Sequence, residues 1–315
     1  MQLWQTKNNS FDKKLHDGPV VATLGNFDGV HAGHRRLITE AVNSAKDRDI
    51  PSILITFDPH PGKILSPGPH SCLLMTLPQK LSVMESLGVE GVWIIPFSRE
   101  FSELAPDAFL SELRKKICPV ELHVGQAFRF GRNRAGDIST LQTWGNSIGC
   151  QVHAHAYAAP DGGALSSSRI RQLLADGNVD MASALLGAPF RLTGAIVEGD
   201  RRGRSLGFPT ANLKWEQEYH PAAGVYLTKV HCQSHLEEPA PGLTNIGIKP
   251  TFGSQCLTIE THLPGMDIDL YGKRIELDFL HRIRGEEKFD CTEALKCKIA
   301  EDIEKGLKWW EARAK

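Results

Sequence analysis

The sequence lacks the features that would place the protein in a membrane, outside the cell or on a nucleic acid. No apolar stretch approaches the roughly 20 residues of a membrane-spanning helix, and residues 1–7 do not resemble a secretion signal. The formal net charge is only −1, so no excess of positive charge attracts nucleic acid or an anionic membrane. Seven cysteines without a C-x-x-C pair argue against a disulfide framework. We therefore expect a cytoplasmic protein that binds neither nucleic acid nor membrane.

Internal repeats and low-complexity tracts are also absent, and the length of 315 residues suggests about two domains. Up to about residue 160, short apolar runs alternate with helical patterns. The predicted buried strands are 20–24, 53–57, 92–95 and 121–124. The predicted helices are 78–87, 106–117, 168–175 and 180–186. Strands that alternate with helices predict an α/β domain with a doubly wound parallel sheet, whose ligands bind at the carboxyl ends of the strands.

Pro189 marks a change of pattern from alternating strands and helices to short strands separated by turn signals. These strands are predicted at 190–197, 225–230, 257–262 and 274–279. Only the tail, from Thr292 to about Trp310, has a helical pattern. We expect a small antiparallel β-barrel with a terminal helix. The boundary near Gly187 gives two predicted domains, residues 1–186 and residues 187–315.

The segment that follows the first predicted strand is the most informative in the chain. It consists of Gly25, Asn26, Phe27, Asp28, Gly29, Val30, His31, Ala32, Gly33 and His34. A strand, a glycine-spaced loop and a helix start together present backbone N–H groups and a positive dipole end to phosphate. The glycines let a nucleotide approach the backbone because they lack a Cβ atom. The two histidines add hydrogen-bond donors, so the segment predicts chemistry at phosphorus.

Other interpretations of this segment are weaker. It is neither a Walker P-loop nor a dinucleotide G-x-G-x-x-G motif. In a lone H-x-G-H motif, the histidines could serve only to cap or pack a turn between a strand and a helix. That structural explanation does not suit the ten-residue form. Zinc binding by His31 and His34 would need a third ligand, and none stands at a useful spacing.

The segment resembles the H-x-G-H signature of the nucleotidylyltransferase superfamily, in the longer form typical of bacterial FAD synthetases. Three later segments resemble the same family in order and spacing: Phe57-Asp58-Pro59-His60-Pro61, Gly125-Gln126-Ala127-Phe128-Arg129-Phe130-Gly131 and Ser166-Ser167-Ser168-Arg169-Ile170-Arg171. From the residues alone, the basic loop that begins at Gly125 is explained as well by a solvated turn as by a phosphate site. Ser167 or Ser168 is explained as well by the role of a helix N-cap.

The resemblance implies roles for particular residues. His31 and His34 would contact the ATP phosphates, and Gly25, Asn26, Phe27, Asp28 and Gly33 would form the nucleotide loop. Ser167, Ser168 and Arg171 would bind the triphosphate, with Arg171 in a catalytic role. The chain departs from the family pattern at two positions. Ser168 replaces the usual threonine and keeps the hydroxyl, whereas Ala127 stands where the family has Asp or Asn and removes a polar group from the loop that would position the flavin.

The second half contains a glycine-rich basic loop, Gly199 to Leu213, which includes the segment Pro209-Thr210-Ala211-Asn212. Backbone donors and cations there suit a triphosphate, and a hydroxyl with an amide can ligate Mg²⁺. With the segments 245–252, 259–263, 269–272 and 284–289, this loop resembles the riboflavin kinase module. The resemblance implies Thr210 and Asn212 as Mg²⁺ and phosphate ligands, and Glu260 as the base for the ribityl hydroxyl of the flavin.

Nucleotide binding in this half is assigned to Gly199, Arg204 and Gly207. Taken singly, Glu260 is as well explained as a solvent-facing strand residue and Thr210 as a turn residue. Five matching segments in one order make that explanation implausible for all of them.

Both modules occur in the order of the bifunctional riboflavin kinase/FAD synthetases of bacteria, and the resemblance covers nearly the whole chain. It implies phosphorylation of riboflavin to FMN by the C-terminal domain, and adenylylation of FMN to FAD, with release of pyrophosphate, by the N-terminal domain. ATP would be the co-substrate of both steps and Mg²⁺ the cofactor. One alternative is a riboflavin kinase with an inactive first domain, which Ala127 alone supports. A non-enzymatic flavin sensor would have no reason to keep Glu260, Thr210 and Asn212 together. The sequence gives no indication of oligomeric state.

Overall fold

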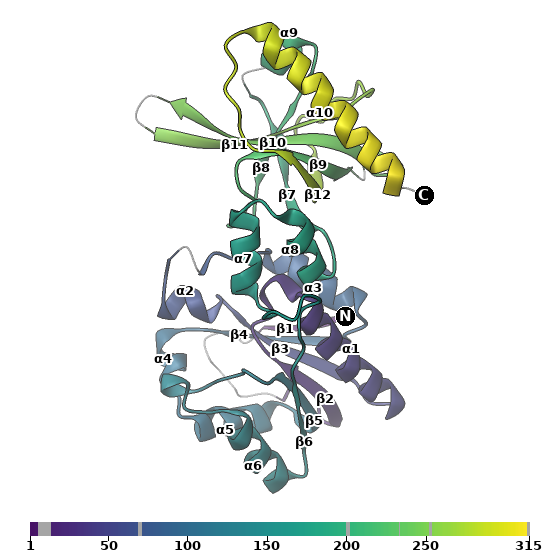
Figure 1. Ribbon diagram of the computed structural model, residues 1–315. Helices are drawn as coiled ribbons and strands as arrows, with labels where there is room; N and C mark the ends of the chain where they lie inside the picture. Colours follow the sequence, from purple (N-terminus) through teal and green to yellow (C-terminus); the bar gives the residue numbers. More distant parts are fainter. Residues whose placement is uncertain (6–13, 69–70, 200–201, 233, 252–253, 314–315) are drawn as a thin grey trace. The chain divides into compact units, whose positions relative to one another are not determined.

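The computed structural model describes residues 1–5, 14–68, 71–199, 202–232, 234–251 and 254–313. The chain divides into two compact units, Met1–Ser167 and Ser168–Lys315 (Figure 1). No helix among these residues is long and apolar enough to cross a membrane.

The first unit is built on a six-stranded parallel sheet. In spatial order its strands are β1 (Gln2–Gln5), β4 (Gly91–Pro96), β3 (Ser52–Asp58), β2 (Pro19–Leu24), β5 (Cys118–Gly125) and β6 (Gln151–His155). The central strands are almost entirely buried, as expected for strands covered on both faces.

Helices cover both faces of this sheet. On one face, α1 (Ala32–Asp47) and α3 (Leu77–Ser86) contribute Leu37, Ile38 and Met84 to a core with sheet residues. On the other face, α4 (Arg99–Ser102), α5 (Pro106–Lys116) and α6 (Ile138–Ile148) contribute side chains such as Phe109 and Leu141 to a second core (Figure 1). This arrangement confirms the predicted doubly wound α/β fold.

The strand order places a topological switch point between β2 and β5. From β2 the chain adds β3 and then β4 on one side, whereas β5 and β6 add on the other side. Ligands of open α/β sheets bind at such a point, beyond the carboxyl ends of the two strands. The segment that starts at Gly25 follows β2, and the segment Gly125–Gly131 begins at the end of β5.

The second unit contains a closed six-stranded antiparallel barrel with a long terminal helix, which confirms the predicted barrel. In spatial order its strands are β10 (Ala240–Thr251), β11 (Ser254–His262), β8 (Ala211–Trp215), β7 (Phe190–Val197), β12 (Arg274–Arg284) and β9 (Gly224–His231). The terminal helix α10 (Thr292–Arg313) packs on β9, β10 and β12. Gly306 allows a close approach there, because a Cβ atom would lie 3.0 Å from Leu243.

Two further helices, α7 (Ser167–Ala175) and α8 (Val179–Leu186), precede the barrel in sequence and pack against it. The Tyr219 hydroxyl donates to the carbonyl oxygen of Arg171 at 2.8 Å, and His281 Nδ1 lies 3.0 Å from a carboxylate oxygen of Asp180. The compact second unit therefore begins at Ser168, whereas the functional boundary at residues 186/187 remains a prediction.

Three threonines mark the interior of the barrel. Thr228, Thr244 and Thr261 are fully buried, and their hydroxyls form a chain with distances of 2.8 and 2.9 Å. Because side chains alternate along a strand, the neighbouring Asn245 and Glu260 lie on the outer face. A polar group on this outer face can meet a substrate without opening the core.

Sequence patterns missed strands β1, β6, β8 and β10. The edge strand β6, Gln-Val-His-Ala-His, has little apolar content, and β10 contains two glycines and two prolines. The loop predicted between Gly199 and Leu213 also contains a short helix, α9 (Arg202–Leu206), and the start of β8. Gly207, with φ of +90°, follows this helix in the conformation that favours glycine.

Candidate active sites

The loop after β2 holds its shape through residues in unusual backbone conformations. Phe27 has φ of +51°, and Gly29 has φ of +75°. Gly33 lies so close to its neighbours that a Cβ atom would come within 2.9 Å of Leu165 and 3.3 Å of Tyr157. His31 is the N-cap of α1, and its Nδ1 accepts from the backbone N–H of His34 at 3.2 Å. The H-x-G-H segment is therefore the start of a helix, as its spacing predicts.

The two imidazoles of this segment are stacked, with ring centroids 3.6 Å apart. Burial lowers the pKa of His31 to about 4. Burial, together with His31 and Lys80, lowers the pKa of His34 well below its ordinary value. Both rings are therefore neutral at pH 7. Since Nδ1 of His31 accepts a bond, its proton is on Nε2, which can donate to a phosphate oxygen.

Two buried charged side chains, Lys80 and Asp28, hold the loop in place through hydrogen bonds. Lys80 of α3 is 5% exposed, and its Nζ donates to the Asn26 carbonyl oxygen at 2.9 Å. The Thr56 hydroxyl donates to the same oxygen at 3.2 Å. Asp28 is also buried, and its carboxylate accepts from the backbone N–H of Leu74 at 3.1 Å. Sequence reasoning missed Lys80, although a lysine on the apolar face of a helix, one turn before Met84, is a detectable signal.

The other predicted residues of this site differ in their surroundings. The Ser167 hydroxyl donates to the Asp28 carbonyl oxygen at 2.9 Å, a contact within the first unit. Ser168 and Arg171 belong to the second compact unit, where Ser168 is exposed and Arg171 is buried. Ala127 is exposed in the turn that follows β5, where the Phe128 N–H donates to the Gly125 carbonyl oxygen at 2.9 Å.

The barrel brings Thr210, Asn212 and Glu260 together. The Thr210 hydroxyl donates to Glu260 Oε2 at 3.1 Å, and Asn212 of β8 is the direct cross-strand partner of Glu260 on β11. Asn245 of β10 is the partner of Glu260 on the other side. Asn245 is the first residue of the segment 245–252 in the predicted kinase module, and its sequence motif implied no individual role for it. Three neighbouring strands thus present a carboxylate between two amides on one face of the barrel.

The glycine-rich loop lies against this group. A Cβ atom on Gly199 would come within 2.3 Å of the Asn212 amide, so only glycine fits there. Arg204 and Thr210 line a cavity of about 280 Å³ whose other walls include Thr261, Asp269 and Tyr271. Arg201 and Phe252, which belong to the predicted kinase motifs, lie outside the described residues.

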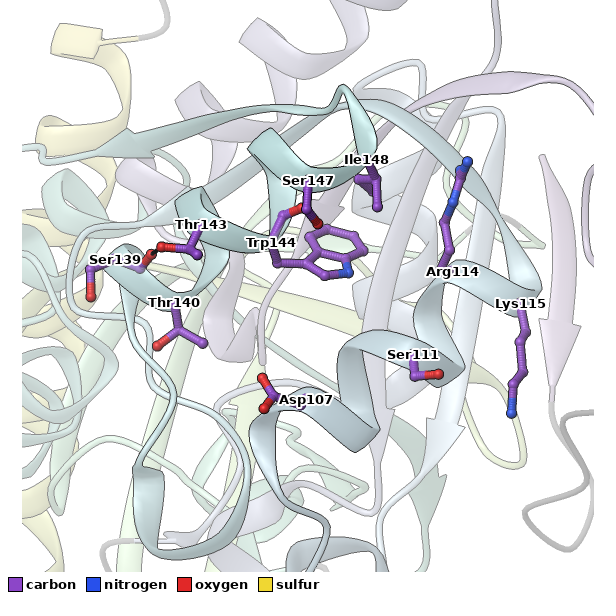
Figure 2. Close-up of a pocket in the computed structure, with 10 residues that line it drawn as sticks. All are labelled: Asp107, Ser111, Arg114, Lys115, Ser139, Thr140, Thr143, Trp144, Ser147 and Ile148. Carbon is purple, nitrogen blue, oxygen red and sulfur yellow. Dashed lines mark hydrogen bonds between the residues drawn. The ribbon is translucent and has the colours of Figure 1, made fainter.

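A larger pocket, of about 840 Å³, lies on α5 and α6 and contains none of the predicted site residues. Figure 2 shows Trp144, Thr143 and Ser147 from α6 together with Ser111, Arg114 and Lys115 from α5. We assign it no part in the predicted reactions, because none of its lining residues belongs to the motifs described above.

Known proteins match both units. A family model described as FAD synthetase matches residues 13–169, and one described as riboflavin kinase matches residues 186–310. The bifunctional riboflavin kinase/FMN adenylyltransferase of Escherichia coli K12 is 38% identical over 283 residues, covering 90% of each chain. The chain belongs to this family. This result confirms the predicted family and enzyme class, and it supports two activities over the alternative of a kinase with an inactive first domain.

Other relatives agree over the same range. The bifunctional enzyme of Haemophilus influenzae is 33% identical, covering 90% of this chain and 91% of its own. A crystal structure from Streptococcus pneumoniae, described as a macrolide-efflux protein, is 28% identical with a TM-score of 0.87, covering 96% of this chain and 98% of its own. The fold described above is thus shared along nearly the entire chain.

Proposed function

We propose that the second unit transfers the γ-phosphate of ATP to riboflavin, and that the first unit adenylylates the resulting FMN. The family supports both reactions. The observation that carries the kinase assignment is the contact between the Thr210 hydroxyl and the Glu260 carboxylate. A cytoplasmic location is retained from the sequence as part of this proposal.

In the kinase reaction, Glu260 acts as the base. Its carboxylate accepts the proton of the flavin ribityl hydroxyl while the oxygen of that hydroxyl attacks the γ-phosphorus of ATP, and ADP leaves as the bond from the γ-phosphorus to the bridging oxygen breaks. The hydrogen bond from Thr210 to Oε2 orients the carboxylate. Phosphoryl transfer depends mainly on positioning and charge stabilisation, so a single oriented carboxylate is sufficient protein chemistry.

Thr210 and Asn212 would hold Mg²⁺. Their hydroxyl and amide oxygens are the hard donors that this ion prefers, and Gly199 lacks the Cβ atom that would fill the space beside Asn212. When bound, Mg²⁺ would neutralise phosphate charge. Gly199, Arg204 and Gly207 would contact the nucleotide through backbone N–H groups and the guanidinium group, and Arg204 already lines the neighbouring cavity.

In the adenylyltransferase reaction, a phosphate oxygen of FMN attacks the α-phosphorus of ATP, and pyrophosphate leaves. No protein nucleophile is needed, so His31 and His34 serve as neutral donors to developing negative charge. The loop Gly25–Asp28, with Gly33, would hold the nucleotide close to backbone N–H groups. Ser167, Ser168 and Arg171 are proposed to bind the triphosphate, on the strength of the sequence motif.

The test incubates the purified chain with riboflavin, ATP and Mg²⁺ and separates FMN from FAD by chromatography. We expect FMN to appear first and FAD to follow. FAD formation from supplied FMN measures the first unit alone. A chain that forms neither product, although circular dichroism shows it to be folded, would refute the proposal, and a chain that forms only FMN would refute the adenylyltransferase half.

A further inference from the structure

A cluster of histidines and one carboxylate lies on β5 and β6 and includes none of the residues assigned above. His123 of β5 is the direct partner of His153 on β6, and Glu121 precedes His123 by two residues on the same face. One ligand atom from each of these three residues lies within 4.8 Å of the others. Glu121 and His123 are buried, whereas the side chain of His153 is 32% exposed and leaves a route for a small ion.

The distances suit a transition-metal ion. Glu121 Oε2 lies 3.3 Å from Nε2 of His123 and 3.8 Å from Nε2 of His153. Ligands about 2.0 Å from a tetrahedral zinc ion lie about 3.3 Å apart, so a small movement of the partly exposed His153 ring completes the geometry. Nε2 of His153 is buried and has no hydrogen-bond partner among the residues the structure describes. A metal ion would satisfy that lone pair.

Surrounding residues orient the three ligands. Glu121 accepts from the hydroxyl of Ser44 on α1 and pairs with Arg48, the C-cap of that helix. Nδ1 of His123 lies 3.0 Å from Nε2 of His155, so the other nitrogen of the His123 ring faces Glu121. His155 is itself fixed through Nδ1, which lies within 3.0 Å of both Glu40 and the Tyr157 hydroxyl. Hydrogen-bonded partners of this kind are the usual support of metal-bound histidine.

We propose that Glu121, His123 and His153 bind one divalent transition-metal ion, with zinc as the best match. Two imidazoles and one carboxylate leave a fourth position for water or another ligand. Magnesium would not compete, because it prefers oxygen donors in octahedral geometry. The ion would join the edge strand β6 to β5, and through the partners of Glu121 to α1.

The test uses the full-length chain, stripped with a chelator and dialysed against metal-free buffer. Titration with Co²⁺ should produce the visible d–d absorption of a tetrahedral site, and Zn²⁺ should abolish it at a stoichiometry of one ion per chain. Zn²⁺ should also raise the melting temperature of the first unit, because it binds only the folded state. Mg²⁺ should do neither.

Variants locate the site. His153→Ala and Glu121→Gln should each weaken Zn²⁺ binding at least about 100-fold, and His155→Ala by about 10- to 100-fold, as expected for a supporting residue. His235→Ala, which removes an exposed histidine of the second unit, is the matched control and should bind as the parent chain does. Circular dichroism monitors folding of the variants, and riboflavin phosphorylation should be unchanged because the barrel contains none of the three ligands.

Three results would overturn the proposal. The first is the absence of a Co²⁺ spectrum in the parent chain. The second is an unchanged spectrum and affinity in a folded His153→Ala variant. The third is a spectrum that persists in that variant but disappears in His31→Ala, which would place the ion at the H-x-G-H segment instead. If His153→Ala does not fold, Glu121→Gln decides between the same outcomes.

Discussion

Replacing Lys80 by methionine should separate the two activities of the chain. Lys80 is buried beneath the nucleotide loop, and its Nζ donates to the Asn26 carbonyl oxygen at 2.9 Å. Methionine preserves the length and apolar contacts of the stem but removes the charged donor. Thr56 still donates to the same carbonyl oxygen, so no buried acceptor is left unsatisfied. We therefore expect a folded protein with a loosened loop.

The magnitude follows from the hydrogen bond that is lost. A bond with one charged partner contributes about 1.5–3 kcal/mol. If the transition state needs the loop in its native position, that energy corresponds to roughly a 10- to 100-fold loss in kcat/KM for FAD synthesis. Global stability should fall as well, by up to about 3–5 kcal/mol, because the substitution removes the positive partner of the buried Asp28 carboxylate.

The assay measures FAD from supplied FMN and, in parallel, FMN from riboflavin, with Lys115→Met as the control for loss of an exposed lysine in the same unit. Thr56→Val alone should have a smaller effect, and the double variant should lose more than the sum of the two, because both donors hold one oxygen. Unchanged FAD synthesis in Lys80→Met would refute the argument. An equal fall in both activities would indicate general unfolding.

Four further predictions concern single features. Glu260→Gln should reduce FMN formation roughly 10²- to 10⁴-fold by removing a general base, while FAD formation from FMN persists. Equal losses of both activities would show that Glu260 has been assigned to the wrong reaction. The burial of His31 lowers its pKa to about 4, so the unfolded chain binds a proton that the folded chain does not between pH 6.5 and 4. Stability should therefore fall by up to about 3 kcal/mol across that range, and urea titrations should show a shallower fall for His31→Asn. Ala127→Asp should raise FAD synthesis without altering FMN formation, and an unchanged rate would show that the exposed turn does not contact flavin. A fragment that starts at residue 187 should phosphorylate riboflavin but melt below one that starts at Ser168, because it loses the contacts of α7 and α8 with the barrel.

The sequence allowed most of the fold to be predicted because its periodicity changes so clearly. Strands β2, β3 and β4 are buried on both faces and give continuous apolar runs, whereas the edge strand β6 alternates polar side chains and gives none. The barrel strand β8 was missed for a related reason, since it is short and mostly half-exposed. Patterns of hydrophobicity report burial, so strands at the edges of sheets or beside functional loops carry the weakest signal.

The candidate sites divide in the same way. His31 and His34 lie on one helix start, and Thr210 and Asn212 on one segment, so local motifs and their resemblance to a family were enough to predict them. Lys80 acts on a loop more than fifty residues earlier, and only the packing of α3 against the sheet brings it there. A lysine on an apolar helical face can be noticed in sequence, but its acceptor cannot.

The histidine cluster on β5 and β6 shows the limit of such reasoning most clearly. Glu121 and His123 alternate along one strand, and His153 and His155 along another, yet helix α6 separates the two pairs in sequence. Because β5 and β6 are parallel, their pairing depends on this helical crossover, and a shift by one residue would turn one pair to the other face. Only the observed register, with His123 opposite His153, places three ligand atoms together. A local motif therefore predicts chemistry when one turn or helix start holds it, whereas chemistry shared between strands depends first on the register of the sheet.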